Sequence, residues 1–218
     1  MHRQSTSEVW PTDFEPKGQD SFRVALQWPR SHAFLTTLPP DSAVMAETIR
    51  QVTILTCHLG YDVPLDSRFL MTGLGFEFRS TERGAGEWRA LEVTARVQGS
   101  DVRRTARGEL RSARMNVDIV GPDGVIAVGH GDALLAGVPA YRRMRGPNAD
   151  ATPPRRTIDP VSPARVGRTR TADVTILETD AGLEVQLDHS HPVFFEHSLD
   201  HVPGVALIEA CKQAACIS

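Results

Sequence analysis

The 218-residue sequence lacks paired cysteines, long apolar runs and an excess of positive charge. Its three cysteines, Cys57, Cys211 and Cys216, predict small buried side chains in a reducing compartment, and they argue against a disulfide framework or a zinc site. No apolar run approaches the roughly 20 residues that a membrane helix needs, and residues 1–8 have no apolar core typical of a signal peptide. A net charge of −3 argues against a dedicated nucleic-acid binder. We therefore expect a globular protein of the cytoplasm.

The first part of the chain predicts one strand followed by one buried helix. Residues 21–28 alternate apolar and polar side chains, which is typical of a half-buried strand. Two prolines and a capping residue, Asp41 or Ser42, then open a helix that runs to about Leu59 and stops at Gly60. This helix is apolar nearly all round, so we expect other structure to enclose it.

Strand-like runs follow this helix, at residues 68–78, 88–98, 105–120 and 125–135. The sequence Gly121-Pro-Asp-Gly124 predicts a tight hairpin between the last two. A strand, a buried helix and then an antiparallel meander is the order of the hotdog fold, an α+β fold in which an antiparallel sheet wraps around a long central helix.

A second, shorter set of elements follows a segment rich in proline and arginine. Residues 137–168 lack periodicity and predict a linker, whose arginines either attract an acidic partner or keep a flexible connector solvated. Beyond them, two strand-like runs separated by a turn at residues 179–182 precede a helix that begins at Gly204. We therefore expect a first hotdog domain over 1–136, a linker over 137–168, and the N-terminal part of a second hotdog domain over 169–218.

The two predicted helices share the pattern Glu-x-x-(Arg/Lys)-Gln, beginning at Glu47 and at Glu209. A carboxylate and an amide four residues apart lie on one helix face. The glutamates are 209 − 47 = 162 residues apart, which is the size of a whole domain and predicts a duplicated module. No meander follows the second helix before Ser218. We expect a tandem hotdog with an incomplete second copy, covered by further chain, by a homodimer or by a partner.

Glu47 and Glu209 are each the sole carboxylate of an otherwise apolar helix. If the helices are enclosed, desolvation should raise the pKa of each carboxyl group towards neutrality, which suits a general base or acid. The alternative is a solvated glutamate at a helix edge. The matched amides of Gln51 and Gln213 favour a site.

Histidines and a glycine precede the second helix. His197 and His201 could share a proton with a substrate or orient the glutamate, or they could simply bind the backbone; His32 stands in the equivalent place in the first copy. Free N–H groups at Gly204 could hold an oxyanion, although Pro-Gly is also an ordinary helix cap. Without a His-Glu-x-x-His helix or a cysteine pair, we expect neither a metal nor another cofactor.

Arg50 places a guanidinium among apolar neighbours, and it needs an anionic partner if it is buried. Glu47, three residues earlier, is the simple partner. A bound phosphate is the alternative.

These residues resemble a known family. Residues 27–34 (Gln-Trp-Pro-Arg-Ser-His-Ala-Phe) and 46–51 (Ala-Glu-Thr-Ile-Arg-Gln) are similar to the first half of the A-factor (γ-butyrolactone) synthase family of actinomycetes. Residues 195–197 (Phe-Glu-His), 200–204 (Asp-His-Val-Pro-Gly) and 207–210 (Leu-Ile-Glu-Ala) are similar to its second half. The resemblance implies a tandem hotdog that transfers a β-ketoacyl group from an acyl carrier protein to dihydroxyacetone phosphate. The ester becomes a γ-butyrolactone-type signal that controls antibiotic production.

The second motif also resembles the hydroxyacyl-carrier-protein dehydratases, whose catalytic residues would fall on His197 and Glu209. The dehydratase Gly-His-Phe-Pro is replaced by residues 196–199, Glu-His-Ser-Leu, which counts against dehydration. The predicted function is acyl transfer from a carrier-protein or coenzyme A thioester, with a dehydratase or thioesterase, or a non-catalytic interaction protein, as alternatives. The predicted catalytic residues are Glu47, Glu209 and His197; the predicted substrate-binding residues are Arg50, Gln51, Gly204, Gln213, His32 and His201.

Overall fold

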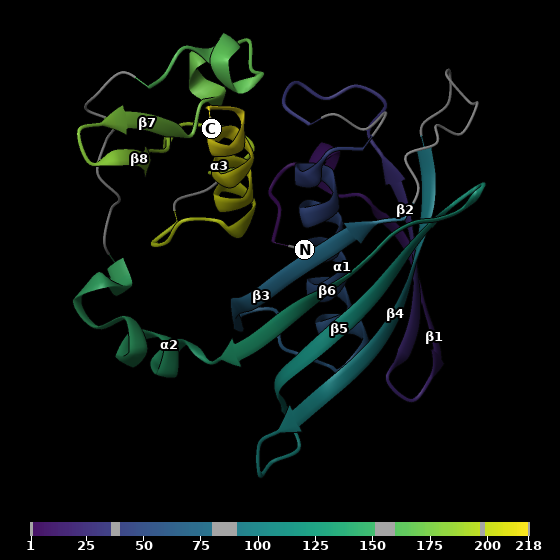
Figure 1. The fold of residues 1–218 in the computed structure, drawn as a ribbon. Coiled ribbons are helices and arrows are strands. Elements are labelled where there is room, and N and C mark those ends of the chain that lie inside the picture. The colour runs from purple at the N-terminus through teal and green to yellow at the C-terminus, as the bar shows by residue number, and fades with distance from the viewer. Residues whose placement is uncertain (1, 36–39, 80–90, 151–159, 197–198, 218) are drawn as a thin grey trace. The chain divides into compact units, whose positions relative to one another are not determined.

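The computed structural model describes residues 2–35, 40–79, 91–150, 160–196 and 199–217 (Figure 1). The chain divides into two compact units, Met1–Gly146 and Pro147–Ser218. In the described part of the chain, no helix combines the length and the apolar character that crossing a membrane requires.

The first unit is a six-stranded antiparallel sheet around one long helix, α1 (Figure 1). The spatial order of the strands is β1-β2-β4-β5-β6-β3. Their bounds are β1 Pro11–Gly18, β2 Ser21–Trp28, β3 Arg68–Phe78, β4 Leu91–Arg104, β5 Leu110–Gly121 and β6 Gly124–Ala136. A short 3-10 helix, η1 (Thr6–Glu8), precedes β1.

The strand predicted at residues 21–28 is confirmed as β2. Its alternate side chains Phe22, Val24, Leu26 and Trp28 are all buried, as the period of two requires. Strand β1 was not predicted because its sequence is polar and contains two prolines. It lies at the edge of the sheet, where a missing backbone N–H is tolerated.

Helix α1 (Ser42–Gly60) confirms the predicted helix and its cap. The Asp41 carboxylate accepts a hydrogen bond from the Val44 N–H at 2.9 Å. Most of its residues are buried, as its nearly continuous apolar surface predicted. Glycines of β6 permit a close approach of the sheet to α1: a Cβ atom at Gly129 would lie 2.7 Å from Cδ1 of Ile49.

The meander is also confirmed. β3 has the predicted bounds, and Gly121 pairs with Gly124 across the predicted tight turn between β5 and β6. β5 begins at Leu110, later than expected, and β4 extends to Arg104. Residues 88–90 of the predicted second run lie outside the described residues. The first unit therefore has the predicted α+β hotdog fold.

The second unit contains a two-stranded antiparallel sheet and one helix. The strands are β7 (Ile176–Thr179) and β8 (Gly182–Val185), and the helix α3 (Gly204–Ile217) begins at the predicted glycine. A 3-10 helix, η4 (Thr171–Asp173), precedes β7. Val161, Val166, Val174, Ile176 and Ala210 form its apolar core.

The segment 137–168 contains more structure than a linker pattern suggests. It includes α2 (Val138–Arg145) and a 3-10 helix, η3 (Pro163–Val166), and it supplies Val161 and Val166 to the core of the second unit. The domain boundaries drawn from the sequence stay a prediction.

The cysteines are free, and only one has the predicted burial. Cys57 is buried, and desolvation raises its thiol pKa to about 12. Cys211 and Cys216 are exposed on α3, so the prediction that they are buried is wrong. Their helix is less completely enclosed than α1 because only the shorter sheet β7–β8 accompanies it.

Candidate active site

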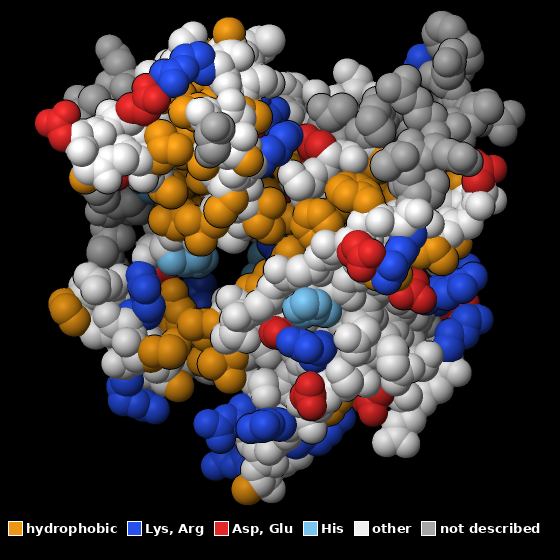
Figure 2. Space-filling model, viewed as in Figure 1, with side chains coloured by type: hydrophobic (Ala, Val, Ile, Leu, Met, Phe, Trp, Pro, Cys, Tyr) orange, Lys and Arg blue, Asp and Glu red, His pale blue; other side chains and the backbone are white. Residues whose placement is uncertain are grey.

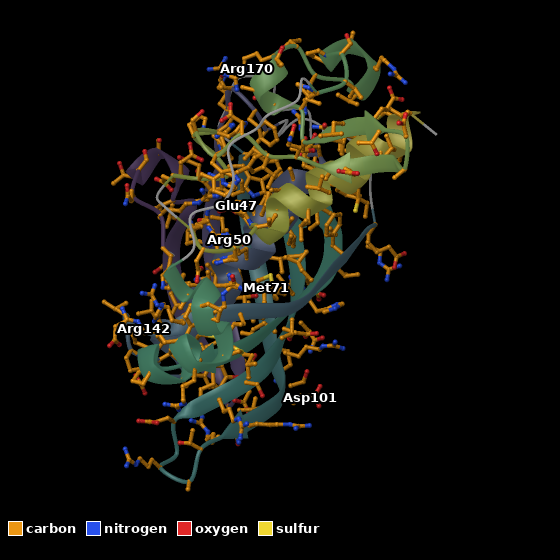
Figure 3. The ribbon with its side chains drawn as sticks, turned by 90° about the vertical axis from the view of Figure 1, so that its left-hand side faces the viewer. Glu47, Arg50, Met71, Asp101, Arg142 and Arg170 are labelled. Carbon is orange, nitrogen blue, oxygen red and sulfur yellow. The ribbon has the colours of Figure 1, made fainter. Side chains whose placement is uncertain are left out.

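Glu47 is buried in α1, with 1% of its surface exposed, and two arginines bind it (Figure 3). Arg50, on the same helix, donates from Nε to Oε2 at 2.9 Å and from Nη2 to Oε1 at 2.7 Å. Arg3, from the N-terminal segment, donates from Nε to Oε1 at 3.1 Å, with Nη2 at 2.9 Å. Two guanidinium groups therefore share one carboxylate, which leaves this trio with a net positive charge.

The pKa of Glu47 is about 2, below its ordinary value of 4.5. Burial alone would raise the pKa, but Arg50, Arg3 and a hydrogen bond from Gln51 stabilise the ionised form more strongly. The predicted burial is confirmed, which excludes a solvated helix-edge glutamate. The predicted shift of the pKa towards neutrality is wrong for Glu47, because the pattern did not reveal how closely the arginines bind it.

Gln51 connects Glu47 to the segment before β1. Its amide nitrogen donates to Glu47 Oε1 at 2.6 Å and to the carbonyl oxygen of Glu8 at 2.8 Å. Its amide oxygen accepts the Trp10 N–H at 3.0 Å. This one side chain therefore fixes the carboxylate, the helix and the first strand relative to each other.

His32 forms the next link. Its Nδ1 accepts the N–H groups of Phe34 at 3.1 Å and Leu35 at 2.9 Å, which assigns the ring proton to Nε2. That Nε2 lies 3.2 Å from both carboxylate oxygens of Glu8. The hydrogen bond from His32 holds the pKa of Glu8 below its ordinary value.

Glu209 of α3, which is fully buried, has the same surroundings in the second unit. Arg168 binds it through two contacts, Nε to Oε1 at 2.8 Å and Nη2 to Oε2 at 2.7 Å. Lys212 lies further away, with Nζ 3.8 Å from Oε2. The amide nitrogen of Gln213 donates to Glu209 Oε1 at 2.7 Å. The predicted burial of the second glutamate is therefore also confirmed.

Gln213 repeats the second role of Gln51. Its amide nitrogen donates to the carbonyl oxygen of Asp173 at 2.8 Å, and its amide oxygen accepts the Thr175 N–H at 2.9 Å. His191 repeats the role of His32: Nδ1 accepts two backbone N–H groups, and Nε2 lies 3.1 Å from Oδ1 of Asp173.

The histidine and aspartate of this second link affect each other's ionisation. Burial lowers the pKa of His191, and Asp173 opposes that shift. Burial by itself would raise the pKa of Asp173, but hydrogen bonds from Arg170 and His191 hold it below its ordinary value.

The two units thus contain one constellation twice, at equivalent positions. Equivalent residues are 168 − 3 = 165 apart before the first strand, 191 − 32 = 159 at the histidines and 209 − 47 = 162 in the helices. The offsets differ only because the connecting loops differ in length. The repeated contacts support the duplicated module that the glutamate spacing predicted.

The remaining predicted site residues have other surroundings. His201 is exposed and pairs with Asp200, its Nδ1 lying 2.8 Å from Oδ1. Gly204 is the first residue of α3, as expected. His197 lies outside the described residues. Among the residues that the structure describes, no group of three or more histidine, cysteine, aspartate or glutamate side chains could hold a metal ion.

Sequence reasoning missed five members of the constellation, which are Arg3, Glu8, Arg168, Asp173 and His191. A signal for four of them was present. The pattern Arg-x-x-Thr-x-(Glu/Asp)-Val occurs at residues 3–9 and again at 168–174. The spacing from the histidine to two apolar residues, at 32–35 and 191–194, would have identified His191 as the partner of His32.

The sequence model of the A-factor biosynthesis hotdog domain family matches residues 1–135 and 149–218. The chain belongs to this family. Both matched segments contain one copy of the buried Glu-Arg-Gln constellation, so members of the A-factor biosynthesis hotdog family can be compared with this chain at both sites.

Curated relatives in this family are similar over nearly the whole chain. A protein of Streptomyces virginiae is 38% identical over 220 residues, which is 99% of this chain and 74% of the relative. A protein of Streptomyces coelicolor is 33% identical over 223 residues, which is 100% of this chain and 70% of the relative. Both relatives carry the name 2-oxo-3-(phosphooxy)propyl 3-oxoalkanoate synthase.

Solved structures are more distant. A hot-dog-like protein from Thermanaerovibrio acidaminovorans is 14% identical, covering 57% of this chain and 86% of that chain with a TM-score of 0.41. At that distance it says nothing about the chemistry of the site.

Proposed function

We propose that this A-factor biosynthesis hotdog protein is an acyltransferase of the cytoplasm. It moves a β-ketoacyl group from an acyl carrier protein or coenzyme A thioester to the hydroxyl group of dihydroxyacetone phosphate, in the biosynthesis of a γ-butyrolactone-type signal. The observation that carries the proposal is the buried Glu47–Arg50–Gln51 cluster, in a chain whose relatives are named for this ester. Their name describes a 3-oxoalkanoic acid joined to a phosphorylated three-carbon ketone.

The reaction requires three services from the protein. The acceptor hydroxyl oxygen forms a bond to the thioester carbonyl carbon, the carbon–sulfur bond breaks, and the hydroxyl proton ends on the departing thiol. A base must take the proton, donors must stabilise the oxyanion, and a cation must hold the acceptor phosphate.

Arg50 is the residue proposed to bind the phosphate. Its side chain is 21% exposed, whereas that of Arg3 is 9% exposed, so Arg50 is the more accessible of the two. A guanidinium matches a phosphate through two parallel hydrogen bonds. Because Glu47 keeps Arg3 as a partner, Arg50 can turn towards a phosphate without leaving the buried carboxylate unpaired.

Glu47 is the proposed base, and its strength depends on the acceptor. With a pKa of about 2 the carboxylate is a weak base while Arg50 binds it. When Arg50 turns to the phosphate, the strongest stabilising charge is withdrawn while burial remains, so the pKa of Glu47 rises. The site thereby gains a base only when the acceptor is in place.

The second constellation is proposed to perform the same chemistry. Glu209 is its base and His197 assists the proton transfer. The N–H groups at Gly204 stabilise the thioester oxyanion, and His201 contacts the substrate. In both units the glutamine and the buried histidine, Gln51 with His32 and Gln213 with His191, hold the carboxylate in position.

A structural role is the second candidate. Every arginine and amide contact described above joins protein groups to one another, and Gln51 anchors α1 to the segment before β1. The constellation would then fasten the helix within each unit, with the non-catalytic interaction protein as the functional reading.

The test uses the purified chain with a β-ketoacyl thioester and dihydroxyacetone phosphate, and detects the phosphorylated ester by mass spectrometry. Glu47→Gln and Arg50→Gln are expected to slow ester formation, while Glu77→Gln, at an exposed surface ion pair, leaves it unchanged. Circular dichroism verifies that each variant folds. The proposal fails if wild-type protein forms no ester, or if folded Glu47→Gln and Glu209→Gln variants both keep the wild-type rate. Hydrolysed acid or enoyl product without any acceptor would identify a thioesterase or dehydratase instead.

A further inference from the structure

One end of the first unit is strongly basic, although the chain as a whole has a net charge of −3. Residues 60–68, 100–111 and 136–146 contain eight arginines and four acidic residues. They meet at one end of the sheet because Arg68 of β3 pairs with Ala136 of β6, and Arg104 of β4 pairs with Leu110 of β5. We call these three segments the basic end.

Most of these arginines are not engaged with acids. Arg103, Arg107, Arg111, Arg142 and Arg143 are exposed, and within the described residues none of them forms an ion pair. In Figure 2, blue side chains gather towards the lower end of the first unit, where Figure 1 places α2 and the turn between β4 and β5. Their charge is therefore available to an anionic partner.

Cation–π contacts fix two parts of this surface. The Arg68 guanidinium lies 6.0 Å from the ring centroid of Tyr141, which joins α2 to the start of β3. The Arg104 guanidinium lies 5.7 Å from the ring centroid of Tyr61, which joins the β4–β5 turn to the end of α1. The arginines are thus presented on ordered elements.

Exposed apolar side chains lie in the same segments. Leu65, in the loop between α1 and β3, is 81% exposed, and Met144 on α2 is 52% exposed. Large apolar side chains among cations are typical of a surface that binds another protein, since they add buried area to charge steering.

We infer that the basic end is the docking surface for an acidic acyl carrier protein that delivers the thioester. This inference rests on the proposed acyl transfer. Gly60, at the basic end, and Glu47 are 13 residues apart on α1, which is about 20 Å along the helix. A long prosthetic arm suits that separation, because the carrier remains at the basic end while its thioester reaches Glu47.

The experiment measures KM for one β-ketoacyl group on three donors: a carrier protein, coenzyme A and N-acetylcysteamine. The variant is Arg142→Glu with Arg143→Glu, and the matched control is Arg96→Glu, an exposed arginine on β4. We expect KM for the carrier-bound donor to rise roughly ten-fold in the double variant, with kcat and both small donors unchanged. The control should behave as wild type for all donors.

Binding of the holo carrier protein, followed by fluorescence anisotropy, gives a readout independent of catalysis. It should weaken by a similar factor in the double variant and with added salt. An unchanged dissociation constant overturns the inference. A parallel rise of KM for coenzyme A shows a site for the phosphates of the donor, and binding to anionic lipid vesicles in place of the carrier shows a membrane surface; either result also overturns it. If no donor supports transfer but the carrier still binds through these arginines, the proposed function fails and the docking surface stands.

Discussion

Replacing Glu47 with glutamine tests whether the buried carboxylate is ionised and paired as the structure shows. The change removes the negative charge between Arg3 and Arg50 and leaves two guanidinium groups around a neutral amide. The pKa of Glu47 lies at about 2 against an ordinary 4.5. At 1.36 kcal/mol for each pK unit, the ionised form contributes about 3 kcal/mol to the free energy of unfolding, within the range measured when buried ion pairs are broken.

The sign of the pH dependence follows from the direction of the shift. A carboxylate whose pKa is lowered by folding stabilises the native state fully above about pH 4.5, and that contribution is lost as pH falls towards 2. The Glu47→Gln variant should therefore be less stable than wild type by about 3 kcal/mol at pH 7, and the difference should narrow below pH 4.5.

Urea unfolding followed by tryptophan fluorescence measures this difference in the correct unit. All three tryptophans lie in the first unit, and Trp10 and Trp28 are buried there. Glu209→Gln breaks the equivalent ion pair in the second unit, which has no tryptophan, and provides the matched control. Equal stability of wild type and Glu47→Gln at pH 7, or a difference that stays constant down to pH 3, would refute the reasoning.

Three further substitutions test the supports of the site by the same unfolding measurement. Gln51→Leu leaves the buried Trp10 N–H without its acceptor and should lower the free energy of unfolding by about 2 kcal/mol; no loss would contradict the anchoring role. Asp41→Ala removes the cap of α1 and should cost about 1 kcal/mol, whereas Asp41→Asn should retain most of it. Gly131→Val places side-chain atoms against Thr53 of α1 and should cost about 1–3 kcal/mol; a neutral effect would show that helix and sheet are not closely packed there.

Local patterns were sufficient to predict the elements of the first unit. The period of two in β2, the capping aspartate of α1 and the Gly121-Pro-Asp-Gly124 turn are each decided by a few neighbouring residues. The burial of Glu47 and Glu209 was predictable for the same reason, since each helix is apolar on nearly every side.

Long-range pairing was the part that local patterns could not supply. Arg3 lies 44 residues before Glu47, and Arg168 lies 41 residues before Glu209 in a segment that reads as a linker. Desolvation and pairing shift a carboxyl pKa in opposite directions, so the sign at Glu47 depends on contacts that only the fold creates. A comparison of the two halves residue by residue was the available route to these partners.

Acceptor preference tests the central claim most directly, because it asks whether Arg50 recognises the phosphate that frees Glu47. The measurement compares kcat/KM for dihydroxyacetone phosphate and for dihydroxyacetone in wild type and in Arg50→Lys and Arg50→Gln. We predict that wild type strongly prefers the phosphorylated acceptor, that lysine retains part of this preference, and that glutamine abolishes it while the protein remains folded. An Arg50→Gln enzyme that prefers the phosphorylated acceptor as strongly as wild type would contradict the claim.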